Sequence, residues 1–326
     1  MKATSTDSPE ENTWNGGGKQ PFKASYGKMM MWFFIMSDAL TFTGFLGAYG
    51  LMRFKFIDSW PIADEVFTHV PFIHGDYPMY YVAFMTFVLI FSSVTMVLAV
   101  DAGKQMKQLK VTTYMFLTII GGVIFLGSQA WEWKTFIKGS YGAVALSDGK
   151  IIQFVDLYGN QVTLESFAAP ATNNERIQQT RSTGIWFESE GSITSVTLRQ
   201  VKEGFANDKK IFVRTELMNK RLKKKTILVR PDANELLKRA THVVEGANLK
   251  ENEYGNTLFG NFFFFITGFH GFHVLSGILI NIIIFFNVIV GTYDYRGNYE
   301  MVEKVGLYWH FVDLVWVFVF TFFYLI

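Results

Sequence analysis

The sequence contains no cysteine in its 326 residues, and this absence excludes several kinds of site. Without thiols the chain can form no disulfide, no thiolate metal centre and no cysteine nucleophile. The formal net charge is only +2, so no strong overall field would attract nucleic acid. The charged middle of the chain also lacks a glycine-rich phosphate loop, a paired-carboxylate site and a nucleophile motif. We therefore predict no nucleic-acid partner and no soluble catalytic domain.

What the sequence has in excess is apolar and aromatic surface. Half of the residues are hydrophobic, 17% are aromatic and 34 are phenylalanine. The apolar residues are bunched into five runs, each long enough to cross a hydrocarbon layer of about 30 Å. The pattern predicts an all-α integral membrane bundle of five transmembrane helices, over 29–52, 80–100, 111–130, 258–290 and 305–326.

The chain between the third and fourth runs has a different character. Charged residues are dense there, and hydrophobicity alternates with period two over 151–157, 161–164, 192–198, 211–217 and 226–229. Gly159-Asn160 predicts a hairpin turn, and a helix is expected over 234–244. A basic cluster, Lys220 to Lys225, is typical of a solvated edge, with a partner surface or lipid headgroups as alternatives.

These features predict four parts of the chain. They are a disordered tail over 1–27, transmembrane helices one to three over 28–133, a β-rich soluble insertion over 134–255, and helices four and five over 256–326. The insertion is interpreted as a binding or assembly module.

Lysines in the short segments indicate the orientation. They concentrate in the N-terminal tail and in the 101–110 loop, whereas acids outnumber bases in the loop after the first run. The positive-inside rule then puts the N-terminus in the cytoplasm and the insertion on the outer, periplasmic side.

Six ionisable residues in or beside the apolar runs are candidate functional residues. Asp38 lies inside the first run and Glu132 at the end of the third, where a lipid-contacting, proton-linked or subunit-contacting role competes with simple packing. His270 with His273, and His310 with Asp313, are spaced i, i+3 and so share one helix face. We expect these four residues to form facing polar stripes that support inter-helix packing.

Two long motifs close to the C-terminus carry a family resemblance. GFHGFHVLSG at 268–277 and YWHFVDLVWVFVF at 308–320 resemble the last two helices of subunit three of haem-copper cytochrome c oxidases. FIMSDALTFTGFLGAY at 34–49, FSSVTMVLAV at 91–100 and LGSQAWEW at 126–133 resemble earlier helices of that subunit. The family typically has seven helices, and five-helix bacterial versions are familiar.

The resemblance implies a function and a set of partners. Subunit three carries no haem or copper; it packs on the catalytic subunit one, binds structural phospholipids and supports proton uptake. Haem a and copper are then expected only in partner subunits, and the location expected is a bacterial inner membrane. Asp38 stands where the family usually has glutamate, and Asn287 where members commonly carry an arginine. The insertion is expected to dock a neighbouring respiratory complex or cytochrome c.

Other functions remain open at this point. A subunit of a quinol oxidase or an accessory subunit of a nitric oxide reductase would share the helix pattern. A transmembrane haem protein would need His270 or His273 to face His310. We expect these histidines near the starts of antiparallel helices, at opposite sides of the membrane, which disfavours a haem bridge. A transporter is disfavoured because the chain shows no internal repeat.

Overall fold

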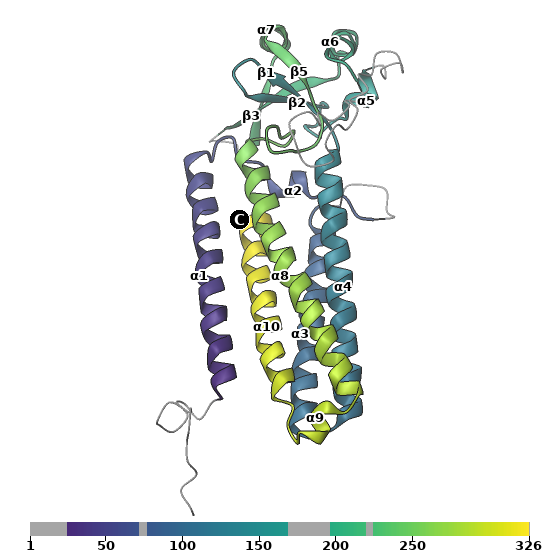
Figure 1. The fold of residues 1–326 in the computed structure, drawn as a ribbon. Coiled ribbons are helices and arrows are strands. Elements are labelled where there is room, and N and C mark those ends of the chain that lie inside the picture. Colours follow the sequence, from purple (N-terminus) through teal and green to yellow (C-terminus); the bar gives the residue numbers. More distant parts are fainter. Residues whose placement is uncertain (1–24, 72–76, 169–195, 220–223, 326) are drawn as a thin grey trace, which may run out of the picture.

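The computed structural model describes residues 25–71, 77–168, 196–219 and 224–325. Figure 1 shows a long helix bundle with a small β-sheet module at one end and the short helix α9 (Thr292–Tyr295) at the other. Residues 1–24 of the expected tail, residues 192–195 of one expected strand and 220–223 of the basic cluster lie outside the described residues.

Five helices in the described chain are long and apolar enough to cross a membrane, as predicted. They are α1 (Tyr26–Lys55), α3 (Tyr80–Lys104), α4 (Gln108–Lys138), α8 (Thr257–Ile289) and α10 (Glu300–Phe320), which the π-helical turn η2 (Thr321–Leu325) continues. Several of these helices begin before or end after the predicted apolar runs. An apolar run marks only the lipid-facing length of a helix, and polar residues can continue the helix beyond it.

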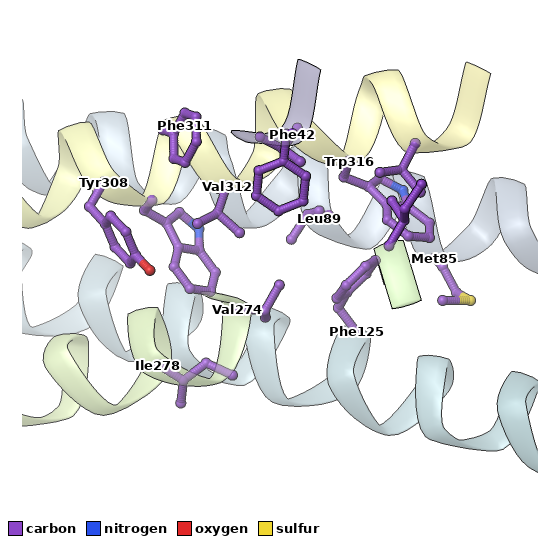
Figure 2. Packing of buried hydrophobic residues seen from close by; sticks show 14 of the residues in the cluster. Phe42, Met85, Leu89, Phe125, Val274, Ile278, Tyr308, Phe311, Val312 and Trp316 are labelled. Carbon is purple, nitrogen blue, oxygen red and sulfur yellow. The ribbon is translucent and has the colours of Figure 1, made fainter. Parts of the chain in front are cut away.

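Close packing of aromatic rings against glycines holds the bundle together. Trp309 on α10 is fully buried between α4 and α8, where a Cβ added at Gly122 or Gly277 would lie 2.6 or 2.9 Å from its ring. Small residues of this kind let membrane helices approach closely. Figure 2 shows the surrounding core, in which Phe125 and Trp316 lie side by side. Helix α1 packs mainly on α8 and α10.

The insertion folds as a five-stranded antiparallel sheet in the order β4-β3-β2-β1-β5. The strands are β1 (Ala143–Leu146), β2 (Ile151–Val155), β3 (Phe212–Asn219), β4 (Lys224–Leu228) and β5 (Ala240–Val244). Helices α5 (Leu164–Phe167), α6 (Leu198–Asn207) and α7 (Arg230–Lys238) contribute to a core on one face of the sheet. Because side chains alternate along a strand, Gln153 and Arg214 point to the other face, toward the bundle.

Three of the predicted strands are confirmed and three predictions are wrong in part. The runs at 151–157, 211–217 and 226–229 correspond to β2, β3 and β4. The run at 161–164 makes only a single bridge, between Gln161 and Val155. The run expected over 192–198 ends at Leu198, which is the first residue of helix α6. The helix expected over 234–244 ends at Lys238, because the β-branched residues that follow pair with β1 as strand β5.

The two ends of the insertion cross where the module meets the bundle. Gly139 and Gly246 both have positive φ, of 81° and 74°, and a Cβ at Gly246 would overlap the Ile137 carbonyl oxygen. The Glu253 carboxylate accepts backbone N–H bonds from Ser140 and Gly246 and so ties the two ends together. Burial raises the pKa of Glu253, and these backbone bonds oppose the rise.

A charged cluster ties the loop after α1 to the sheet. Glu65, in the short helix α2 (Ala63–Val66), accepts two bonds from Arg214 at 2.9 Å and lies 3.5 Å from the Lys225 ammonium. The side chains of Arg214 and Lys225 are only 6% and 2% exposed. Lys225 was expected on a solvated edge; instead it is buried, and burial lowers its pKa to about 8 against the opposing effect of Glu65.

Candidate functional site in the centre of the bundle

Asp38 and His273 form a polar pair between α1 and α8. The Asp38 Oδ2 atom lies 3.2 Å from His273 Nε2, and the two side chains are 18% and 9% exposed. His273 Nδ1 lies 2.8 Å from the carbonyl oxygen of Phe269, which can only accept, so Nδ1 carries a hydrogen. The contact between Nε2 and Oδ2 then requires one shared proton, on the carboxyl or on the ring. The pair thus gives each group a polar partner between α1 and α8.

His270 occupies an aromatic box one turn away on α8. It is fully buried, with ring centroids 5.4 Å from Trp316, 5.9 Å from Phe125 and 6.4 Å from Phe42. Among the described residues neither ring nitrogen has a hydrogen-bond partner. Its neighbours come from α1, α4 and α10, so His270 packs where four helices meet.

His310 and Asp313 face α3 rather than α8. The Ser93 hydroxyl lies 2.8 Å from His310 Nδ1 and also faces the Asp313 carboxyl. Asp313 is 9% exposed, whereas His310 is only half-buried. The expected stripes therefore do not face each other directly: His273 turns to α1, and His310 and Asp313 turn to α3.

The histidines of α8 and α10 lie at similar depth in the bundle. The Tyr308 hydroxyl is 2.7 Å from Ser276 Oγ and 3.3 Å from the His273 carbonyl oxygen. The expectation that His273 and His310 lie at opposite sides of the membrane is wrong. Because α8 and α10 begin well before the motifs, both histidines fall in the middle of their helices. Their rings nevertheless point to different neighbouring helices.

Glu132 lies near the module end of the bundle, away from the other five residues. Both of its carboxylate oxygens lie 3.0 Å from the Tyr324 hydroxyl, and its exposed fraction is 5%. A cavity of about 20 Å³ adjoins it, lined also by His69, Tyr81 and Thr135, which is roughly room for one water molecule. Glu132 is thus held inside this chain, and the π-helical turn η2 presents its tyrosine.

Sequence reasoning missed the partners of these residues. Ser93 and Tyr308 lie within the quoted motifs but carry no charge to single them out, and Tyr324 lies 192 residues from Glu132. Only the contact of helices distant in sequence reveals such pairs. In the part of the chain that the structure describes, no group of three or more metal-binding side chains comes together.

Comparison with known proteins finds a similarity over the C-terminal part of the chain. Residues 248–326 match the family model of cytochrome c oxidase subunit III. The chain is similar to a probable cytochrome c oxidase subunit 3 of Rickettsia prowazekii, with 38% identity over 77 residues, 23% of this chain and 28% of that protein. It is also similar to cytochrome c oxidase subunit 3 of Arabidopsis thaliana, with 42% identity over 71 residues, 20% of this chain and 24% of that protein.

A third relative has the same extent of likeness. Cytochrome c oxidase subunit 3 of Rhipicephalus sanguineus is 43% identical over 70 residues, which are 21% of this chain and 26% of that protein. The chain thus spans about a quarter of the length of the curated relatives it matches. The family match contains α8 and α10, and so His270, His273, His310 and Asp313, whereas Asp38 and Glu132 lie outside it.

Proposed function

We propose, from the match of residues 248–326 to the family model of cytochrome c oxidase subunit III, that this multi-pass membrane chain is the non-catalytic third subunit of an aa3-type cytochrome c oxidase. In this role it packs against the catalytic subunit one, binds structural phospholipids and supports proton uptake and assembly during electron transfer to oxygen. Haem a and copper reside in the partner subunits. The membrane is a bacterial inner membrane, with the N-terminus cytoplasmic.

One observation carries this proposal most directly. The family match covers α8 and α10, which carry four of the six candidate residues: His270, His273, His310 and Asp313. Polar groups within membrane helices are costly in lipid and are kept where a bundle or an assembly needs them.

The test is to purify the tagged chain in mild detergent and to record reduced-minus-oxidised spectra of what co-purifies. Haem a absorbance together with larger oxidase subunits is the expected result. A chain that emerges alone with b-type haem would support the transmembrane haem protein instead. Oxygen uptake with reduced cytochrome c, compared with quinol, then separates the aa3-type oxidase from a quinol oxidase, and nitric oxide consumption identifies a nitric oxide reductase.

Asp38 is proposed as a proton-linked residue of this subunit. The contact of 3.2 Å between Asp38 Oδ2 and His273 Nε2 is the supporting observation, because it places an acid and an imidazole in hydrogen-bond reach inside the bundle. In the assembled oxidase, Asp38→Ala should hasten the loss of activity during turnover while the haem content stays intact. Asp101→Ala, at the exposed end of α3, is the matched control. Equal decay in both variants would remove this role.

Glu132 is proposed as a lipid-linked or proton-linked group beside its small cavity.

The β-rich module is proposed as a docking surface for a neighbouring respiratory complex or cytochrome c on the periplasmic side. Its hairpin tip supports docking, since Tyr158 is 90% and Leu157 65% exposed there. Deleting residues 143–244 leaves the crossing at Gly139 and Gly246 in place, and an intact larger assembly on native gels would refute the docking role.

A further inference from the structure

The outer face of α10, which no other described helix covers, carries the imidazole of His310. The side chains that point outward along α10 repeat every three or four residues, at Leu307, His310, Leu314 and Val317. Leu314 and Val317 are 56% and 44% exposed. Within the described residues, His310 Nδ1 is bonded to Ser93, but Nε2 has no hydrogen-bond partner.

The depth of His310 limits what can bind it. His310 lies five residues past Val305, where the apolar run of α10 begins, which is about 7.5 Å at 1.5 Å per residue. That places it inside a hydrocarbon layer about 30 Å thick, in the half where α10 begins. Lipid phosphates lie outside this layer, so the partner that suits Nε2 is a polar group carried by another membrane-embedded segment.

Asp313 provides a second, independent observation on the same helix. Its carboxyl oxygens are buried beside Ser93, and neither forms a hydrogen bond of ordinary geometry to a described residue. An ionisable side chain at this depth normally pairs with another polar group. The trio of Ser93, His310 and Asp313 therefore has more hydrogen-bonding capacity than the described chain uses.

The same molecule shows how such a histidine is satisfied. On the neighbouring side of α10, His273 of α8 would face outward in the same way, but α1 covers it and supplies Asp38. At this depth helix α1 is held by aromatic packing of Phe42 on Phe269 and His273 together with the Asp38 contact, and nearer its start by the Lys28–Glu303 ion pair. The outer face at His310 has the polar anchor, but no described helix of this chain covers it.

We propose that the outer face of α10, with His310 as its anchor, is the seat of a transmembrane helix from a partner subunit. That helix presents a carboxyl, hydroxyl or amide side chain to His310 Nε2 and small or aliphatic residues to Leu314 and Val317. The inference rests on the proposed function, because it requires a membrane assembly, and it adds which face of this chain makes the contact.

The test is photo-crosslinking in native membranes. A benzoylphenylalanine is placed at position 314 and, as a matched control, at position 272. Phe272 is 66% exposed on α8 and lies at similar depth, since His270 stacks on Trp316 and Ser276 bonds Tyr308. The expected result is a crosslink from position 314 to a membrane-embedded peptide of another subunit, and lipid adducts alone from position 272.

A second variant tests the anchor itself. His310→Leu in the position-314 background should lower the crosslink yield about threefold or more, the factor that corresponds to one interhelical hydrogen bond in a membrane. His310→Gln keeps a polar group and should recover much of the yield. Equal yields in the leucine and glutamine variants would overturn the role of His310, since packing alone would then hold the partner.

The outcomes separate this inference from the proposed function. If oxidase subunits co-purify with the chain but position 314 yields only lipid adducts, the inference fails while the proposed function stands. If nothing co-purifies and position 314 gives no protein crosslink, both fail.

Discussion

The bundle and the β-sheet module solve the same problem, the burial of polar groups, in different ways. In the bundle, buried ionisable side chains make small local contacts, as in the Asp38–His273 and Glu132–Tyr324 pairs, and aromatic rings fill much of the space around them. In the module, Glu65, Arg214 and Lys225 form one network of full charges. Water near the module can solvate charged groups that are partly exposed, whereas lipid cannot.

The comparisons reach only one of these two regions. The family match covers residues 248–326, which include α8 and α10 and begin after the last strand of the sheet. The connections between the module and the rest of the chain include the Gly139–Gly246 crossing, the Glu65 cluster and a backbone bond from Met218 to Asp58. Variants at these connections test how independent the two regions are.

The largest effect is expected from Gly246→Ala, at the crossing between the regions. Gly246 has φ of 74°, and a Cβ there would overlap the carbonyl oxygen of Ile137. The left-handed backbone alone costs alanine about 1 to 2 kcal/mol, and the clash with a backbone atom adds to this. We expect a large fall in the thermal unfolding midpoint, measured by calorimetry in detergent.

Gly149→Ala is the matched control for this variant. Gly149 also has positive φ, of 79°, but nothing lies within 4 Å of an added Cβ. It should show only the backbone cost of about 1 to 2 kcal/mol. Equal shifts of the unfolding midpoint in the two variants would mean that the crossing imposes no steric constraint.

A smaller but still substantial effect is expected from Glu65→Gln. The change leaves the buried Arg214 and Lys225 without their carboxylate, and breaking a buried ion pair in this way costs about 3 to 5 kcal/mol. The free energy of unfolding of the module should fall accordingly in urea titrations. Glu203→Gln, in the exposed pair with Arg199, is the control and should cost less than about 1 kcal/mol. A loss below 1 kcal/mol for Glu65→Gln would show that the cluster is solvated like the surface pair.

The sequence predicted the bundle far better than the module. Long apolar runs identify membrane helices by composition, and the five helices are confirmed. Strand β1, with the sequence Ala-Val-Ala-Leu, was missed because four apolar residues covered on both faces show no alternation. Lys225 was misread because a run of basic residues gives no sign that one of them is opposite Glu65, 160 positions earlier in the chain.

The candidate site was predicted in its residues but not in its pairings. Spacing alone shows that His310 and Asp313 share a face, yet it does not show which neighbouring helix that face contacts. For Asp38 the sequence left a lipid-contacting, proton-linked or subunit-contacting role open beside simple packing, and it did not identify His273 as the residue that its carboxyl contacts. Helix order around the bundle decides such pairings, and it depends on packing between segments more than 200 residues apart.

The smallest effect is expected from pH, and it should appear in the module alone. Burial lowers the pKa of Lys225 to about 8, from 10.5 in the unfolded chain; Glu65 opposes this change and the nearby Arg214 adds to it. Between these values the unfolded state binds more protons than the folded state, so stability should rise as pH increases from about 8 to 10.5. The slope cannot exceed about 1.4 kcal/mol per pH unit for one group. Lys225→Met should abolish the rise in urea titrations at pH 8, 9 and 10, and a rise that persists in this variant would assign it to another group.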